Sequence, residues 1–183
     1  RVQSIYDYKG KINPGLLQKS WEYAQCRYEA LRLRFSWEEE LVQVIDKQGA
    51  LNWQYLDISG KTAKERKAYI NSLVSEDRGK SFDLQSAPLF RVCLVKQEER
   101  LYTCLLSCHH AILDGWSDSV LLNYVHQAYY RHRRRAQKIP AICPPGQPTT
   151  GGAIDDRRAG MFPVGRVEGY PTGISFSHRR RYC

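Results

Sequence analysis

Apolar residues recur along this chain at two spacings, one typical of strands and the other of helices. Short apolar or alternating runs predict strands at residues 2–8, 31–36, 41–46, 52–57, 89–96 and 101–108. Apolar positions three and four residues apart predict helices at about 14–28, 62–79 and 117–130. The last two strands flank a polar turn at 97–100, which indicates a long hairpin.

Capping residues set the expected helix starts. Asn13 followed by Pro14 is typical of a first turn. Thr62 with Glu65 forms a capping box, and Ser117 is the expected cap of the last helix. His126 on that helix and His132, just beyond its expected end, are interpreted as ordinary surface residues.

The predicted order is strand, helix, strands, helix, hairpin, helix. This order favours an α+β fold, in which a mixed sheet carries its helices on one side. We therefore expect one folded unit at 1–130. The following residues, 131–183, lack apolar periodicity and are rich in proline and glycine, which predicts a disordered tail.

Charge separates the same two parts. Residues 1–130 hold 17 Lys and Arg against 16 Asp and Glu, a net +1, whereas residues 131–183 hold 11 against 3, a net +8. The basic character therefore belongs to the tail, which is interpreted as a flexible basic segment, a nucleic-acid arm or a sequence that has lost its reading frame. We favour loss of frame, because nothing after Tyr130 continues the preceding pattern.

Six cysteines at 26, 93, 104, 108, 143 and 183 show no paired spacing. We interpret them as reduced residues of a cytosolic protein. Zinc ligation by Cys104, Cys108, His109 and His110 is disfavoured, because it would need ligands from both faces of a strand. No apolar run reaches the length of a membrane span, and no signal peptide is visible. The start at Arg1 indicates a fragment of a longer chain, or a processed or cloned piece.

The segment after the last predicted strand contains the strongest candidate chemistry. It reads His109-His110-Ala-Ile-Leu-Asp114-Gly115-Trp116-Ser117 and joins that strand to the final helix. Loops at strand ends are where side chains reach ligands. Adjacent strand residues point to opposite faces, so we expect one histidine to act in a cavity and its neighbour to brace the turn.

This spelling resembles the HHxxxDG signature of the condensation domains of nonribosomal peptide synthetases, in the variant that continues as DGWS. Residues 27–35 resemble the family's RHExLRTxF block, with Tyr28 in place of its histidine and Leu33 in place of its threonine. Phe82-Asp83-Leu84 followed by Pro88 matches a further block. The resemblance covers residues 1–130 and implies the N-terminal lobe of a chloramphenicol acetyltransferase-like fold.

The resemblance implies an acyltransferase that forms amide (peptide) bonds between acyl groups held as thioesters on phosphopantetheine arms. No cofactor would be bound directly. The implied partners are donor and acceptor peptidyl carrier proteins and an adjacent adenylation domain of the parent synthetase, with no membrane and no nucleic acid.

By the same resemblance, His110 is the catalytic residue, acting as a base or as a hydrogen-bond partner that orients the amine. Histidine suits either role because its ordinary pKa is about 6.5. Asp114, weighed as an acid, is expected instead to hold the turn. The remaining supporting residues are expected to be His109, Gly115, Trp116, Ser117, Arg27 and Arg32.

Two rival interpretations remain open. One is a related acyltransferase or epimerisation domain of the same superfamily, and the other is a non-catalytic basic binding protein with both histidines in its core. The family's active site lies between two lobes, so we expect little activity from this fragment alone.

Overall fold

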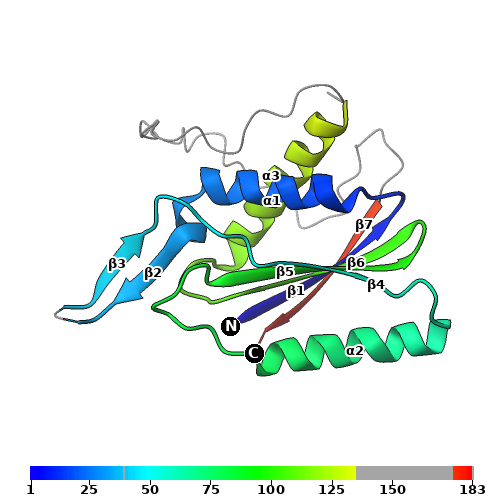
Figure 1. Cartoon of the computed structure of the whole chain (residues 1–183), viewed down its shortest axis with the longest axis horizontal. Coiled ribbons are helices and arrows are strands. Elements are labelled where there is room, and N and C mark those ends of the chain that lie inside the picture. The colour runs from blue at the N-terminus through cyan, green and yellow to red at the C-terminus, as the bar shows by residue number, and fades with distance from the viewer. Residues whose placement is uncertain (39, 135–174, 183) are drawn as a thin grey trace.

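A five-stranded mixed sheet forms the centre of the molecule in the computed structural model, which describes residues 1–38, 40–134 and 175–182. Its strand order is β4-β5-β6-β1-β7, and the strands are β1 (Val2–Lys9), β4 (Trp53–Asp57), β5 (Phe90–Glu98), β6 (Leu101–Cys108) and β7 (Ser175–Tyr182). Among the strands in these described ranges, only β4 and β5 are parallel neighbours. Parallel neighbours require a crossover connection, which α2 (Ala63–Gly79) supplies (Figure 1).

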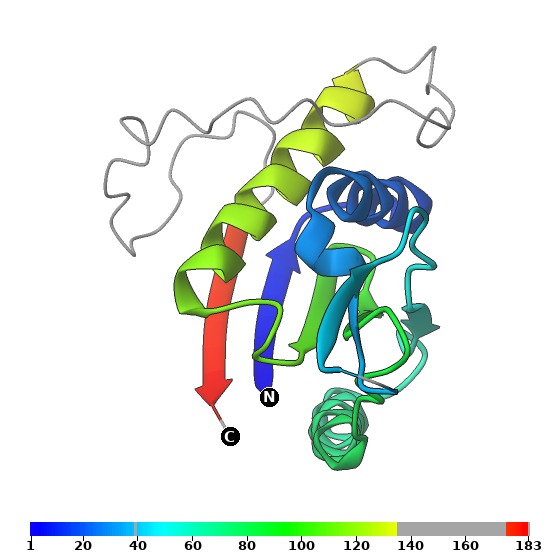
Figure 2. The same ribbon diagram turned by 90° about the vertical axis from the view of Figure 1, so that its left-hand side faces the viewer.

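Helices cover both faces of this sheet. The first helix, α1 (Pro14–Arg27), and the last, α3 (Gly115–Arg134), lie on one face, and α2 lies on the other (Figure 2). The expectation of helices on one side is therefore wrong. The physical reason is visible in β5, where Leu94 packs in the α1–α3 core and its neighbour Val95 packs in the core beneath α2. Both faces of β5 are apolar, so both need a cover.

A separate hairpin projects from the body (Figure 1). Its strands are β2 (Leu33–Ser36) and β3 (Val42–Ile45). The strand predicted from residue 31 begins later, because residues Glu29–Arg32 form a 3₁₀ turn, η1. The buried Gln25 side chain donates to the Leu31 carbonyl at 3.2 Å and holds that turn in place.

The two predicted caps on α1 and α2 are confirmed. The Asn13 Oδ1 accepts from the Leu16 N–H at 3.0 Å at the start of α1. At the start of α2, the Glu65 carboxylate accepts from the Thr62 N–H at 2.8 Å and the Thr62 hydroxyl accepts from the Glu65 N–H. Short-range sequence signals were sufficient here because both partners lie within three residues.

The interpretation of His126 and His132 as ordinary surface residues is wrong. The Nε2 of His126 lies 3.1 Å from the hydroxyl of Tyr8, a β1 residue that is only 1% exposed. Burial lowers the pKa of His126 to about 4. His132 stacks on Tyr23 of α1 with ring centroids 4.9 Å apart. Both histidines therefore belong to the contact between α3 and the layers beneath it.

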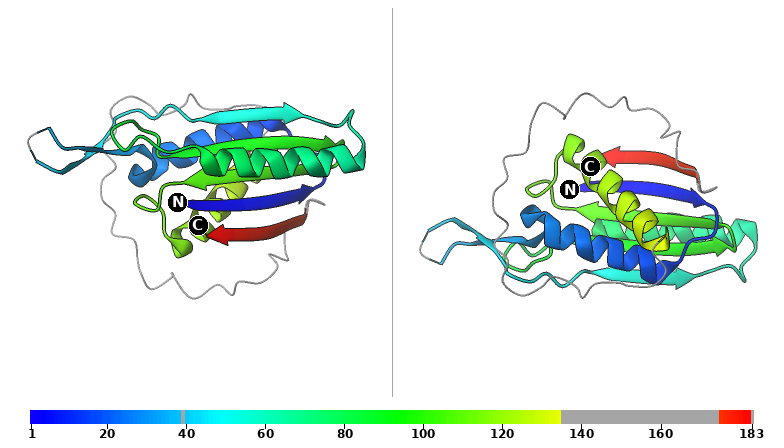
Figure 3. Two further views of the ribbon diagram at one scale, coloured as in Figure 1. Left: turned by 90° about the horizontal axis from the view of Figure 1, so that it is seen from below. Right: turned by 90° about the horizontal axis from the view of Figure 1, so that it is seen from above.

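The far end of the chain also differs from expectation. α3 continues to Arg134, four residues beyond the expected end of the folded unit. Residues Ser175–Tyr182, assigned to the disordered tail, form β7 and pair antiparallel with β1 at the edge of the sheet (Figure 3). The rest of that tail, residues 135–174, lies outside the described residues. No helix in the described ranges is long and apolar enough to cross a membrane.

Candidate active site

The candidate site begins where the β5–β6 ladder ends. Phe90 pairs with Cys108 at the last register position of the hairpin. One further backbone bond follows, because the His109 N–H donates to the Leu89 carbonyl at 2.8 Å. The first histidine of the pair is thus still fixed to the neighbouring strand when the chain turns away.

His109 is half-buried against the loop that follows α2. Its ring meets Phe82 edge to face, with centroids 6.5 Å apart and an interplanar angle of 81°. Its Nδ1 accepts from the Ala111 N–H at 3.3 Å, and its carbonyl accepts from the Ile112 N–H at 3.2 Å. Burial lowers the pKa of His109, and the positive charge of the Arg1 side chain acts in the same direction. These contacts are those of a residue that shapes a turn.

His110 is exposed at the next position, in the turn itself. The two histidines, which both follow the end of β6 at Cys108, therefore differ in environment: His109 lies against protein and His110 is open to solvent. An exposed imidazole at a strand end is available to a ligand, whereas the packed one is not.

Asp114 caps the helix that follows the histidines. Its Oδ1 accepts from the Ser117 N–H at 2.7 Å, and its carbonyl accepts from the Asp118 N–H at 3.3 Å. The helix starts at Gly115, so the prediction that Ser117 is the cap is wrong, and Ser117 is instead the residue whose N–H is capped. The surroundings of Gly115 and of the Trp116 side chain lie outside the described part of the structure.

Replacing this cap gives a stability prediction. We expect Asp114→Ala to lower the free energy of unfolding by about 1 kcal/mol, because the first turn of α3 loses its side-chain acceptor. Asp114→Ser retains an acceptor at the same position and should unfold close to wild type. Urea unfolding of the three proteins measures the difference. Equal midpoints for Asp114→Ala and wild type would contradict the capping role.

A second carboxylate, Asp118, anchors the start of α3 to the sheet. It is 2% exposed, and its Oδ2 accepts from the Ser4 hydroxyl and from the Tyr6 hydroxyl, each at 3.0 Å. Both partners lie on β1, more than 100 residues earlier in the chain. No local sequence pattern could therefore have predicted this contact. These bonds tie the segment after the histidines to β1, which lies between β6 and β7 in the sheet.

The two arginines of the upstream block lie around the end of α1. Arg27 is the exposed last residue of that helix. Arg32 is half-buried, and its guanidinium donates to the backbone carbonyls of Gln25, Asp46 and Lys47. Arg32 therefore braces the connection between α1 and the β2–β3 hairpin. Tyr28, which stands where the family block has histidine, packs edge to face on Tyr124 of α3 at 5.4 Å between centroids.

The described ranges contain no group of three or more His, Cys, Asp and Glu side chains placed to hold a metal ion. An open groove of about 780 Å³ lies beside α2, lined by residues including Asp7, Arg66, Lys67 and Arg78. That groove is lined by none of the histidine-loop residues, so it is a feature separate from the candidate site.

Comparison with known sequences identifies the family. A family model for the condensation domain matches residues 1–142. The N-(5-amino-5-carboxypentanoyl)-L-cysteinyl-D-valine synthase of Penicillium rubens is 43% identical over 131 residues, which is 70% of this chain and 3% of the synthase. Bacitracin synthase 3 of Bacillus licheniformis is 33% identical over 140 residues, covering 75% of this chain and 2% of that protein. The chain thus spans only a few per cent of the curated relatives it matches.

Solved structures agree on the fold. The starter condensation domain of rhizomide synthetase RzmA superposes with a TM-score of 0.67 at 21% identity, covering 79% of this chain and 36% of that one. SgcC5 of Streptomyces globisporus superposes with a TM-score of 0.64 at 22% identity, covering 79% and 32%. The chain belongs to the condensation-domain family of nonribosomal peptide synthetases. It has the chloramphenicol acetyltransferase-like fold expected from the sequence.

Proposed function

We propose that this chain is part of a condensation domain that joins two carrier-bound acyl groups through an amide bond. The observation that supports this most directly is the position of His110, exposed at the end of β6 in a loop that His109 and the Asp114 cap hold in place. A thioester is already activated toward amines, so the domain has mainly to position two tethered substrates and keep the attacking amine unprotonated.

His110 takes the central role in this proposal. Its imidazole accepts a proton from the amine, or accepts a hydrogen bond that orients it, as the amine nitrogen attacks the thioester carbonyl and the thiol of the donor arm leaves. His109 is assigned no chemical step, because its Nδ1 accepts from the Ala111 N–H and its ring packs on Phe82. Asp114 is assigned to the turn.

The partners follow from the reaction. The donor and acceptor groups would arrive on the phosphopantetheine arms of two peptidyl carrier proteins, with an adenylation domain adjacent in the parent synthetase. The domain itself would need no bound cofactor. One similar structure, a variant of the RzmA starter condensation domain, is a complex with C8-CoA and Leu-SNAC, which is consistent with thioester substrates. The cytosolic location inferred from the cysteines stays part of this proposal.

An assay with carrier-bound substrates tests the function. The 183-residue chain and the complete condensation domain that contains its residues 1–134 would each be mixed with loaded donor and acceptor carrier proteins. Mass spectrometry of the acceptor arm would then detect the amide product. We expect product with the complete domain and little or none with the chain alone. Absence of product from the complete domain with every carrier pair of the parent synthetase would overturn the proposal.

A further inference from the structure

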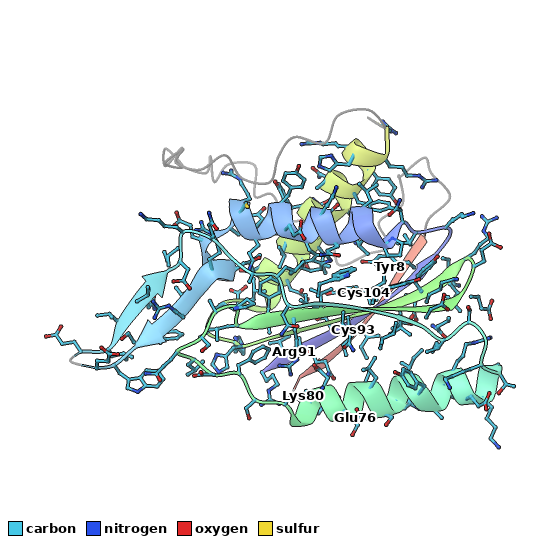
Figure 4. The ribbon with its side chains drawn as sticks, in the orientation of Figure 1. Tyr8, Glu76, Lys80, Arg91, Cys93 and Cys104 are labelled. Carbon is cyan, nitrogen blue, oxygen red and sulfur yellow. The ribbon has the colours of Figure 1, made fainter. Side chains whose placement is uncertain are left out.

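Arg91 lies in a polar cluster between the sheet and the C-terminal end of α2, near Lys80 (Figure 4). Its guanidinium donates to the Asp77 carboxylate, to the Asp77 carbonyl at 2.8 Å and to the Lys80 carbonyl at 2.9 Å. The Asp77 carboxylate also accepts from Gln3 at 2.8 Å and from the Ser107 hydroxyl. With donations to two backbone carbonyls and one carboxylate, the plane of the guanidinium is fixed.

The charge state of this cluster is also fixed. Burial raises the pKa of the Asp77 carboxyl, but hydrogen bonds from Arg91, Ser107 and Gln3 outweigh that effect and hold the pKa below its usual range. The side chains of Asp77 and Arg91 are only 10% and 16% exposed. A charged pair removed from water in this way keeps its geometry only while both partners remain.

The fixed guanidinium in turn supports an aromatic stack that ends at the histidine loop. The Arg91 Cζ lies 4.3 Å from the centroid of the Phe82 ring, well within cation–π range. The same Phe82 ring contacts His109 edge to face. Arg91 also pairs with Ser107 across the β5–β6 ladder, two residues before His109. Arg91 is therefore connected to His109 in two ways, through the Phe82 ring and through the β5–β6 ladder.

We propose that Arg91 and Phe82 are positioning residues for the histidine loop. They hold the ring of His109, and the orientation of His109 sets the direction in which His110 leaves the strand. This inference deepens the proposed function, because its value for catalysis rests on His110 acting at the site. Neither Arg91 nor Phe82 is assigned contact with substrate.

Histidine NMR on the 183-residue chain tests the positioning directly. Labelled His109 and His110 would be titrated in wild type, Phe82→Ala, Phe82→Tyr and Arg91→Lys. Loss of the Phe82 ring exposes His109, so Phe82→Ala should raise the His109 pKa toward its ordinary value and shift the His110 signals. Arg91→Lys retains the charge but loses the planar contact with Phe82. It should change the His109 pKa and the His110 signals in the same direction as Phe82→Ala. Phe82→Tyr retains the ring and should titrate like wild type.

Arg66→Lys is the matched control. Arg66 is also 16% exposed in its side chain, is paired with Glu98 and donates to a backbone carbonyl, that of Lys61. It does not belong to the stack, so Arg66→Lys should leave both histidine titrations unchanged. Thermal melts of all variants show which are folded, and Arg91→Lys keeps the test valid if Phe82→Ala does not fold.

The same variants in the complete condensation domain separate positioning from function. We expect Arg91→Lys and Phe82→Ala to lower kcat by about tenfold to a hundredfold with KM nearly unchanged. Unaltered histidine titrations in both variants, or equal changes in Arg66→Lys, would overturn the positioning role even if His110 proves essential. Altered titrations in a domain that is fully active without His110 would instead overturn the proposed function and leave the stack in place.

Discussion

Replacing His110 by alanine should reduce amide formation by about 10²- to 10⁴-fold in the complete condensation domain, the usual range for lost acid–base assistance. His110 is exposed in its turn, so its removal leaves no cavity and the melting temperature should stay near that of wild type. The measurement is product formation from loaded carrier proteins, alongside thermal melts of both proteins.

His109→Ala is the informative comparison. Because the His109 ring contacts Phe82 and its Nδ1 accepts from Ala111, this change should lower the melting temperature as well as activity. A His110→Ala domain with full condensation activity would refute the catalytic assignment. A stable and inactive His109→Ala domain would move the chemical role to the first histidine.

The free energy of unfolding should decrease in acid because His126 has a lowered pKa in the folded protein. Burial lowers the His126 pKa to about 4, whereas the unfolded chain binds that proton near pH 6.5. As pH falls below 6.5, His126 becomes protonated in the unfolded state but stays neutral in the folded state. The free energy of unfolding therefore decreases until about pH 4. The loss attributable to this single group is about 3 kcal/mol.

The variant His126→Gln isolates that contribution. Glutamine retains a polar group facing Tyr8 and does not titrate, so the difference in unfolding free energy between wild type and variant should change steadily between pH 6.5 and 4. Carboxylates such as Asp77 titrate in both proteins and cancel in the difference. Urea unfolding at half-unit pH steps measures it. Parallel curves for the two proteins would contradict the burial of a neutral imidazole.

Local features of the fold were predictable from the sequence, and long-range contacts were not. The capping box of Thr62 and Glu65 spans one helical turn, and a two-residue turn separates β5 from β6. Both features can therefore be predicted from residues that are close in sequence. The position of α2 was missed, because the parallel pairing of β4 with β5 is not visible in either strand alone.

The candidate site divides in the same way. The histidine pair and Asp114 are recognisable because they are spaced within one loop. The contact of Phe82 with His109 joins the loop after α2 to the end of β6, and the bond of Tyr8 with His126 joins β1 to α3. Val125 and Tyr129 of α3 are buried in the core, but helical periodicity gave no indication that the half-buried His126 between them contacts Tyr8.

The pairing of β1 with β6 also constrains how the protein emerges from the ribosome. Val2 pairs with Cys108 and Lys9 with Leu101, so β1 cannot complete its ladder until roughly 100 further residues have been synthesised. By contrast, β5 and β6 follow each other directly in the sequence, and contacts of low sequence separation form first. During translation β1 therefore remains unpaired until β6 has been synthesised. Nascent chains with unpaired strands bind chaperones and are prone to aggregation. Any transcript truncated before the codons for β6 would encode a polypeptide in which β1 lacks both of its sheet neighbours, β6 and β7.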